Sequence, residues 1–213
     1  MSVSVIITNY NNGMYLGRAI RSCLNQSLKD VEVIVVDDCS TDDSRAVIQT
    51  MPVVPVLLPK NVGVAAASNE GIRKATGEYI IRVDSDDYVN QNTFLFLSQI
   101  LEWNKDIGFV YTDHLKVNDK EHVIGRGNLN TLDLLYRHGA GIMFRKSYLE
   151  AIGLYDEKLR NAEDYDLLKR YIKNFNGYHL PLPLYRYRQH DTNMTNDEEE
   201  RKRWESFVDE NRK

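Results

Sequence analysis

Three carboxylates within four positions form the strongest chemical signal in the chain. Asp84-Ser85-Asp86-Asp87 directly follows an apolar, β-branched run. Like charges this close repel one another unless a cation joins them. Mg²⁺ and Mn²⁺ prefer oxygen ligands, and Mg²⁺ commonly uses only one or two carboxylates together with substrate phosphates. The D-x-D triplet therefore predicts a site for Mn²⁺ or Mg²⁺, with a solvated acidic turn as the alternative.

A second acidic group opens a predicted helix at Glu163-Asp164-Tyr165-Asp166. Acids in a first helical turn are favoured by the helix dipole, so simple capping is one interpretation. The other is chemical, because Asp164 is the kind of group that takes a proton from an attacking hydroxyl. The two acidic groups stand 164 − 84 = 80 positions apart, so only the fold can bring them together.

The densest mixture of aromatic and basic side chains is Tyr185-Arg186-Tyr187-Arg188-Gln189-His190. His190 could ligate a metal, and Arg186 or Arg188 could pair with phosphate. A hydrogen-bonded surface histidine is the simpler alternative for His190. Nucleic-acid binding through this patch would need a wider basic surface than the sequence offers.

The elements that must position these groups alternate in the first half. Strands are predicted at 3–7, 31–36, 53–58 and 78–83, with helices at 14–25, 46–48 and 64–75. This order implies a parallel sheet with helices on both faces, and ligands collect beyond the carboxyl ends of such strands. Polar residues stand at those ends: Thr8, Asn9, Tyr10, Asp37, Asp38, Asn61, Gly63 and Asp84 to Asp87. Four further polar residues are predicted to serve as turn and cap residues: Asn11, Asn12, Asp42 and Asp43.

The second half is less regular. The pattern predicts helices at 93–103, 146–152 and 163–174, and strands at 109–112, 142–144 and 185–188. A polar segment at 116–130 is predicted to be a loop or an exposed hairpin. We expect one catalytic domain over 1–195, with a nucleotide-binding half at 1–90 and an acceptor half at 91–195. A charged helix over 196–213 should dock through Trp204, Phe207 and Val208, unless it binds another protein.

Composition limits the remaining possibilities. The 213 residues suit one domain, and 27 − 31 gives a net charge of −4. This balance argues against nucleic acid or an anionic membrane as the main partner. No stretch reaches the length of a transmembrane segment, and the N-terminus lacks a leader pattern. Cys23 and Cys39 form no metal or disulfide motif, which predicts free thiols in a reducing, cytoplasmic setting.

Eight motifs in order resemble family 2 glycosyltransferases of the GT-A fold. G-x-G-x-x-G and P-loop patterns are absent, which disfavours dinucleotide and P-loop binding. The resemblance covers about residues 3–190 and rests on these segments: Ser4–Asn11, Glu32–Asp38, Asn61–Gly63, Gly77–Ile80, Asp84–Asp87, Ile152–Asp156, Glu163–Leu167 and Tyr187–His190.

The resemblance implies an α/β GT-A fold and sugar transfer from a nucleotide diphosphate sugar, usually a UDP-sugar, to a hydroxyl acceptor. It implies that Asp86 binds Mn²⁺ or Mg²⁺, with His190 completing the metal shell in some members. Asp164, in the pair with Glu163, would be the general base of an inverting displacement. The donor nucleotide would be held by Thr8, Asn9, Tyr10, Asp38, Asn61, Gly63, Asp84 and Ser85.

Other functions stay open at this point. A sugar nucleotidyltransferase would need a basic, glycine-rich loop after the first strand, and the segment Thr8–Gly13 contains no Lys or Arg. A non-catalytic nucleotide-binding module would not need Asp164 and His190. The Q-x-x-R-W motif of cellulose and hyaluronan synthases is absent, which favours addition of a single sugar over polymerisation.

Overall fold

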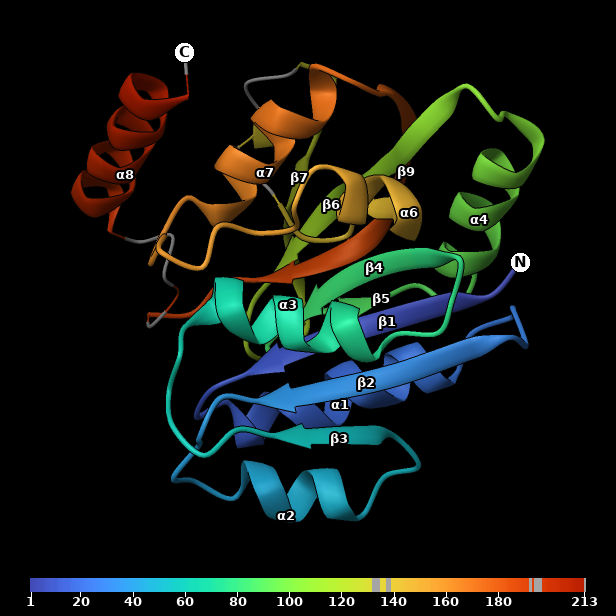
Figure 1. Ribbon diagram of the computed structural model, residues 1–213. Coiled ribbons are helices and arrows are strands. Elements are labelled where there is room, and N and C mark those ends of the chain that lie inside the picture. The colour runs from blue at the N-terminus through green and yellow to red at the C-terminus, as the bar shows by residue number, and fades with distance from the viewer. Residues whose placement is uncertain (132–134, 137–138, 192, 194–196, 213) are drawn as a thin grey trace.

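The computed structural model describes residues 1–131, 135–136, 139–191, 193 and 197–212. Strands and helices alternate in the first half, because β-branched runs are separated by turn-forming residues and helical periodicities (Figure 1). The elements are β1 (Val3–Asn9), α1 (Gly13–Leu24), β2 (Val31–Asp37), α2 (Ser44–Gln49), β3 (Val54–Leu57), α3 (Val64–Lys74), β4 (Tyr79–Asp84) and β5 (Tyr88–Val89).

The elements of the second half are α4 (Thr93–Trp103), β6 (Ile107–Val117), β7 (Val123–Gly127), β8 (Met143–Arg145), α6 (Lys146–Ala151), α7 (Glu163–Ile172), β9 (Asn176–Arg188) and α8 (Glu198–Asn211). The second half adds the two longest strands of the part of the chain that the structure describes, β6 and β9.

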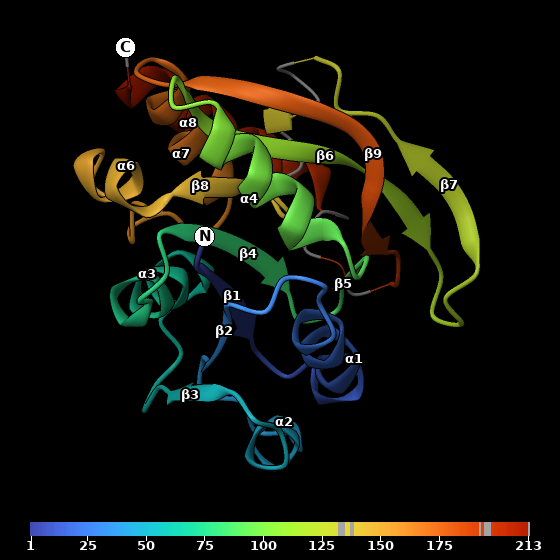
Figure 2. The ribbon, with the colours of Figure 1, turned by 90° about the vertical axis from the view of Figure 1, so that its right-hand side faces the viewer.

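The strands in the described residues all belong to one mixed sheet. The order is β3-β2-β1-β4-β8-β6-β9-β5, and β7 pairs with β6 beside this path. The first four strands are parallel, as the sequence predicts. Antiparallel pairing begins at β4 with β8, and β6 then pairs parallel with β9. Figure 2 shows that β6, β7 and β9 curve over the end of β4, so the second half closes against the first within a single sheet.

Two apolar layers cover the sheet. Alternate residues of β1 and β4 pack with α1 and α4 on one face, and the others pack with α3, α6 and α7 on the opposite face. Tyr79, Ile81 and Val83 belong to the first face, and Ile80 belongs to the second. The period of two therefore directs Arg82 and Asp84 toward the face that carries α7.

Two segments differ from their predicted form. β9 is thirteen residues long rather than four, since it continues through Pro181 and Pro183 beside irregularities in its pairing with β6. The 116–130 segment contributes the end of β6 and the strand β7, so it is a hairpin for much of its length.

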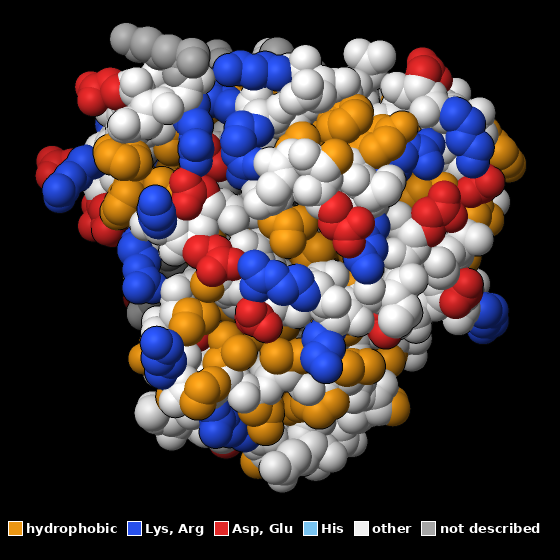
Figure 3. Space-filling model, in the orientation of Figure 1, with side chains coloured by type: hydrophobic (Ala, Val, Ile, Leu, Met, Phe, Trp, Pro, Cys, Tyr) orange, Lys and Arg blue, Asp and Glu red, His pale blue; other side chains and the backbone are white. Residues whose placement is uncertain are grey.

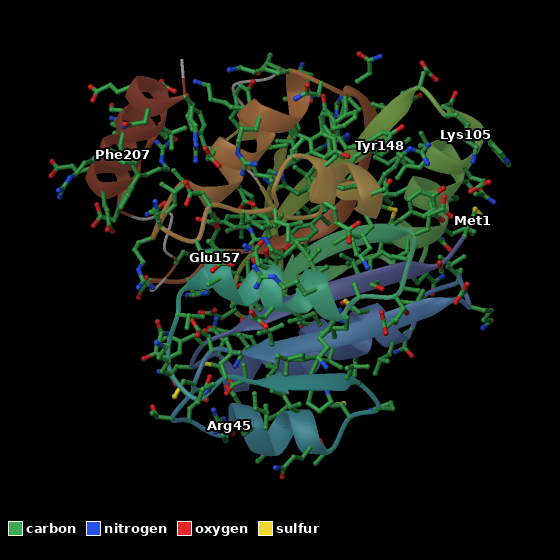
Figure 4. All side chains as sticks on the ribbon, viewed as in Figure 1. Met1, Arg45, Lys105, Tyr148, Glu157 and Phe207 are labelled. Atoms are coloured by element: carbon green, nitrogen blue, oxygen red, sulfur yellow. The ribbon has the colours of Figure 1, made fainter. Side chains whose placement is uncertain are left out.

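The C-terminal helix α8 lies against α7 (Figure 1). Val208 is buried, whereas Phe207, labelled on α8 in Figure 4, is 49% exposed. Polar contacts to α7 complete the docking, because the Asp209 carboxylate accepts hydrogen bonds from Tyr165 Oη and Lys169 Nζ. Of the three residues predicted to dock this helix, Val208 is therefore the most deeply buried.

None of the described helices combines the length and apolar character needed to cross a membrane. On the face shown in Figure 3, basic and acidic side chains are interspersed rather than separated into patches.

Candidate functional site

A carboxylate and an imidazole from distant parts of the sequence meet beyond β4. Asp86 Oδ2 lies 2.9 Å from His190 Nε2, although 104 positions separate the two residues. The pairing of β5 with β9 brings them together, since it sets Tyr88 opposite Arg186. Arg188 tightens the connection, because its Nε donates to the Asp86 carbonyl and its backbone N–H donates to Asp87 Oδ1.

The β6–β7 turn and α1 hold this pair from the side (Figure 2). The Tyr15 ring stacks on His190 with 5.2 Å between ring centroids, and Tyr15 Oη donates to Asp119 Oδ1 at 2.9 Å. Arg188 Nη1 donates to the carbonyls of Asn118 and Asp119. The Lys116–Asn130 segment thus supports His190. Nothing in the sequence indicates this role for Tyr15, because it lies within an ordinary amphipathic helix.

The donor set at Asp86 and His190 suits a hard to borderline divalent ion. Two adjacent ligands of an octahedral ion with bonds of about 2.1 Å lie about 3 Å apart, close to the separation found here. Among the described residues, no group of three His, Cys, Asp or Glu side chains is arranged to hold a metal. A metal at this site would therefore use two protein ligands and take the rest from phosphate or water.

A buried arginine connects the two acidic groups that the sequence singled out. Arg82 Nη1 lies 3.0 Å from Asp84 Oδ1, and Arg82 Nη2 lies 2.5 Å from Asp164 Oδ2. The acidic groups thus share one guanidinium despite their distance in sequence. Arg82 was not among the predicted site residues, although alternation along β4 places residues 82 and 84 on the same face.

The Asp164 carboxylate is held from two further sides. Tyr155 Oη donates to Asp164 Oδ1 at 3.1 Å, and Tyr155 itself is fixed because Asn69 exchanges hydrogen bonds with its backbone. Glu157 anchors the same loop over α3 (Figure 4). Gly139 leaves room for Asp164, since a Cβ there would lie 1.9 Å from Asp164 Cγ.

Burial among carboxylates raises the pKa of several acids. Desolvation raises the pKa of Asp84 to about 6, and Arg82 opposes the shift. Desolvation, reinforced by Asp164, raises the pKa of Glu163 to about 7. The pKa of Asp87 lies well above its ordinary value, again mainly because of burial. Perturbed acids gathered at one edge of a sheet are typical of a functional site.

Glu163 makes the stability of the protein depend on pH in a defined direction. Its pKa rises on folding from its ordinary 4.5 to about 7, so the folded state binds the extra proton between these values. The contribution of Glu163 to stability is therefore fully present below pH 4.5 and is lost as pH rises to about 7, by roughly 3 kcal/mol.

Replacing Glu163 with Gln should flatten this dependence. We expect the urea midpoint of Glu163→Gln to exceed that of the wild type at pH 8 and to change less between pH 5 and pH 8. The Glu70→Gln variant serves as control, because the Glu70 side chain is 45% exposed, and it should keep the wild-type slope. A Glu163→Gln slope equal to the wild-type slope would show that this carboxyl does not titrate in the window.

The other predicted donor-binding residues lie at the carboxyl ends of β1 to β4. Thr8 pairs with Asp84 across β1 and β4, and Tyr10 is half exposed. Asn9 is buried and donates to Asp37 Oδ1 and Ser40 Oγ. Ser85 is buried and accepts a hydrogen bond from Asn12 Nδ2. Among Thr8, Asn9, Tyr10 and Ser85, Tyr10 is the most exposed.

Asp38 organises the start of α3. Its two carboxylate oxygens accept hydrogen bonds from the backbone N–H groups of Val62 and Gly63 at 2.7 and 2.8 Å. Asn61 Nδ2 approaches the Asp38 carbonyl at 3.3 Å. Gly63 has φ +89°, a left-handed conformation that glycine adopts without strain. In this structure Asp38, Asn61 and Gly63 therefore shape one loop together.

The predicted turn residues connect neighbouring loops. Asp42 accepts hydrogen bonds from the Ser44 and Gly13 backbone N–H groups, and Asn11 Oδ1 accepts one from Thr41 N–H. Asp43 precedes α2 without a side-chain capping bond.

The mixed sheet with helices on both faces is the GT-A fold of glycosyltransferases. The chain belongs to glycosyl transferase family 2, whose family model matches residues 4–153. That range contains the D-x-D but ends before Asp164 and His190. The contacts with Arg82 and Asp86 bring these two residues to the same site.

Similarity to individual proteins agrees with this assignment. The chondroitin synthase of Pasteurella multocida is 32% identical over 209 residues, covering 91% of this chain. The chain spans only 21% of that protein. The structure of S. aureus TarS 1–349 in complex with UDP-GlcNAc matches with a TM-score of 0.79 at 23% identity, over 92% of this chain and 61% of TarS 1–349.

A mannosyltransferase from Pyrobaculum calidifontis, solved with GDP-Man and Mn²⁺, has a TM-score of 0.71. It is 20% identical, and the match covers 89% of this chain and 57% of that one. These two structures establish the fold, and the family assignment establishes that the chain is a glycosyltransferase.

Proposed function

We propose that this glycosyltransferase moves a sugar from a nucleotide diphosphate sugar, first of all a UDP-sugar, to a hydroxyl acceptor in glycan or polysaccharide synthesis. A divalent metal at Asp86 and His190 would neutralise the charge that develops on the leaving diphosphate. Asp164 would take the proton of the acceptor hydroxyl, and the sugar would be transferred with inversion.

The observation that carries this proposal is the meeting of Asp84 and Asp164 on the guanidinium of Arg82. An inverting displacement needs a base on one side of the sugar and a stabilised leaving group on the other. One guanidinium that touches both acids keeps these two sides within a few ångströms of each other.

Two similarities support the choice of donor and metal. TarS was solved with UDP-GlcNAc, and the Pyrobaculum mannosyltransferase was solved with GDP-Man and Mn²⁺. UDP-sugars with Mn²⁺ are therefore the first combination to test, with GDP-mannose as the second.

The test is release of nucleoside diphosphate from a panel of nucleotide sugars, with Mn²⁺ or with EDTA, over a panel of hydroxyl acceptors. We expect turnover of one donor class that depends on the metal. Pyrophosphate release from a nucleoside triphosphate would instead indicate a nucleotidyltransferase. Stabilisation by a nucleotide sugar without turnover of any acceptor would indicate a binding module. Single addition stays a prediction, and the length of the product in the same assay decides it.

A further inference from the structure

Arg82 is a charged side chain in the middle of a central strand. Its side chain is 8% exposed, and β4 lies between β1 and β8 in the sheet. The Arg82 side chain lines a small cavity together with apolar residues: Ile6, Ile72, Ile80, Phe144 and Leu149. An isolated guanidinium in such surroundings would be strongly destabilising, so its retention depends on the carboxylates that it meets.

The carboxylates come from two separate parts of the chain. Asp84 follows Arg82 on β4, whereas Asp164 belongs to the first turn of α7. Glu163 Oε1 lies 4.0 Å from the same guanidinium, so Asp84, Glu163 and Asp164 surround one cation. Without that cation these acids would repel one another, and the repulsion would act between the first turn of α7 and the end of β4.

The geometry points to Arg82 as a positioning residue for the transfer reaction. Its planar fork holds Asp164 at a fixed place relative to Asp84, and so relative to the D-x-D turn. Arg82 acts through Asp164 and does not itself touch the reacting atoms. Tyr155 Oη donates to the other oxygen of the same carboxylate. The backbone of Gly139 packs against its other side, where a Cβ would leave no room. This inference rests on the proposed role of Asp164 as the base.

A double-mutant cycle tests the inference. The variants are Arg82→Met, which keeps the length of the stem, Asp164→Asn, and the two combined. The readouts are UDP release from the UDP-sugar that the wild type turns over, and calorimetric binding of UDP with Mn²⁺. We expect Arg82→Met to lower kcat about 100-fold, the effect of a small misplacement of a catalytic group. Binding of UDP should stay within about threefold.

The combined variant distinguishes positioning from an independent role. In the Asp164→Asn background, Arg82→Met should lower kcat by less than about threefold, because its effect passes through the group already lost. A further 100-fold loss in that background would overturn the inference, as would wild-type kcat in Arg82→Met. Full activity of Asp164→Asn would contradict the proposed base instead, so the two failures are distinguishable.

Two more variants protect the test against simple unfolding. Arg82→Lys keeps the charge but loses the fork, so it should fold and still lose at least about 10-fold in kcat. Wild-type kcat in Arg82→Lys would show that charge alone is sufficient and would overturn positioning by the fork. Arg145→Met is the matched control on the neighbouring strand β8, since Arg145 is equally buried but donates to the Leu101 and Ile107 carbonyls. It should lower stability with kcat within about twofold.

Discussion

The Asp164→Asn variant is expected to lose about 1,000-fold in kcat, within the range that general base catalysis contributes. The amide has the same shape as the carboxylate, and its oxygen can still accept from Tyr155 Oη or from Arg82, so the first turn of α7 should keep its place. It cannot accept the acceptor's proton. Because Asp164 lies on the acceptor side of the proposed site, binding of UDP with Mn²⁺ should change less than about threefold.

Steady-state kinetics and calorimetry on the purified variant measure both quantities. Asp166→Asn is the matched control, because Asp166 stands two positions further along α7 and is fully buried beside Arg170 and Arg212. It should lose stability and keep kcat. If Asp164→Asn retained more than a tenth of wild-type kcat, another group would have to be the base.

The Asp86→Ala variant should lose turnover by about 1,000-fold as well, for a different reason. A bound divalent ion contributes several kcal/mol of charge stabilisation to a leaving phosphate, and Asp86 supplies its only proposed carboxylate ligand. The effect should therefore include binding: Mn²⁺ should no longer strengthen the calorimetric binding of UDP. His190→Ala should show the same defect more weakly, since one ligand remains.

Removing the metal from the wild-type protein with EDTA should have the same effect on turnover as Asp86→Ala. Chelation should remove wild-type turnover, and added Mn²⁺ should restore it, whereas Asp86→Ala should not respond to either. Asp43→Asn, an exposed acid in the same half of the chain, serves as control and should behave as wild type. Wild-type turnover that persists in EDTA, together with an active Asp86→Ala, would rule out the metal mechanism.

Much of the first half could be predicted from sequence, because each of its elements has a local cause. The strands β1, β2 and β4 are β-branched runs bounded by turn-forming residues, and α3 begins directly after Gly63. The polar residues at strand ends follow from the parallel order of these strands. The family resemblance then supplied roles for Asp86, Asp164 and His190 that spacing alone could not.

The features of the site and fold that were not predicted depend on contacts between residues far apart in sequence. Arg82 interrupts an apolar strand, and nothing near it in sequence indicates a partner 82 positions away. Tyr155 and Tyr15 look like ordinary aromatic residues until the loops around them are in place. β9 contains Pro181 and Pro183, so its local pattern reads as irregular, and its pairing with β6 determines its true length.

The 104 positions between Asp86 and His190 also determine at which point of protein synthesis the proposed site can form. A ribosome adding about 5–20 residues per second needs roughly 5–20 s to pass from one to the other. During that time the acidic turn has emerged, but His190, Arg188 and Asp164 have not all been made. A nascent chain that ends at residue 153 would contain the whole segment matched by the family model, yet it would lack the proposed base and one proposed metal ligand. The proposed site therefore cannot be complete before β9 and His190 have been synthesised.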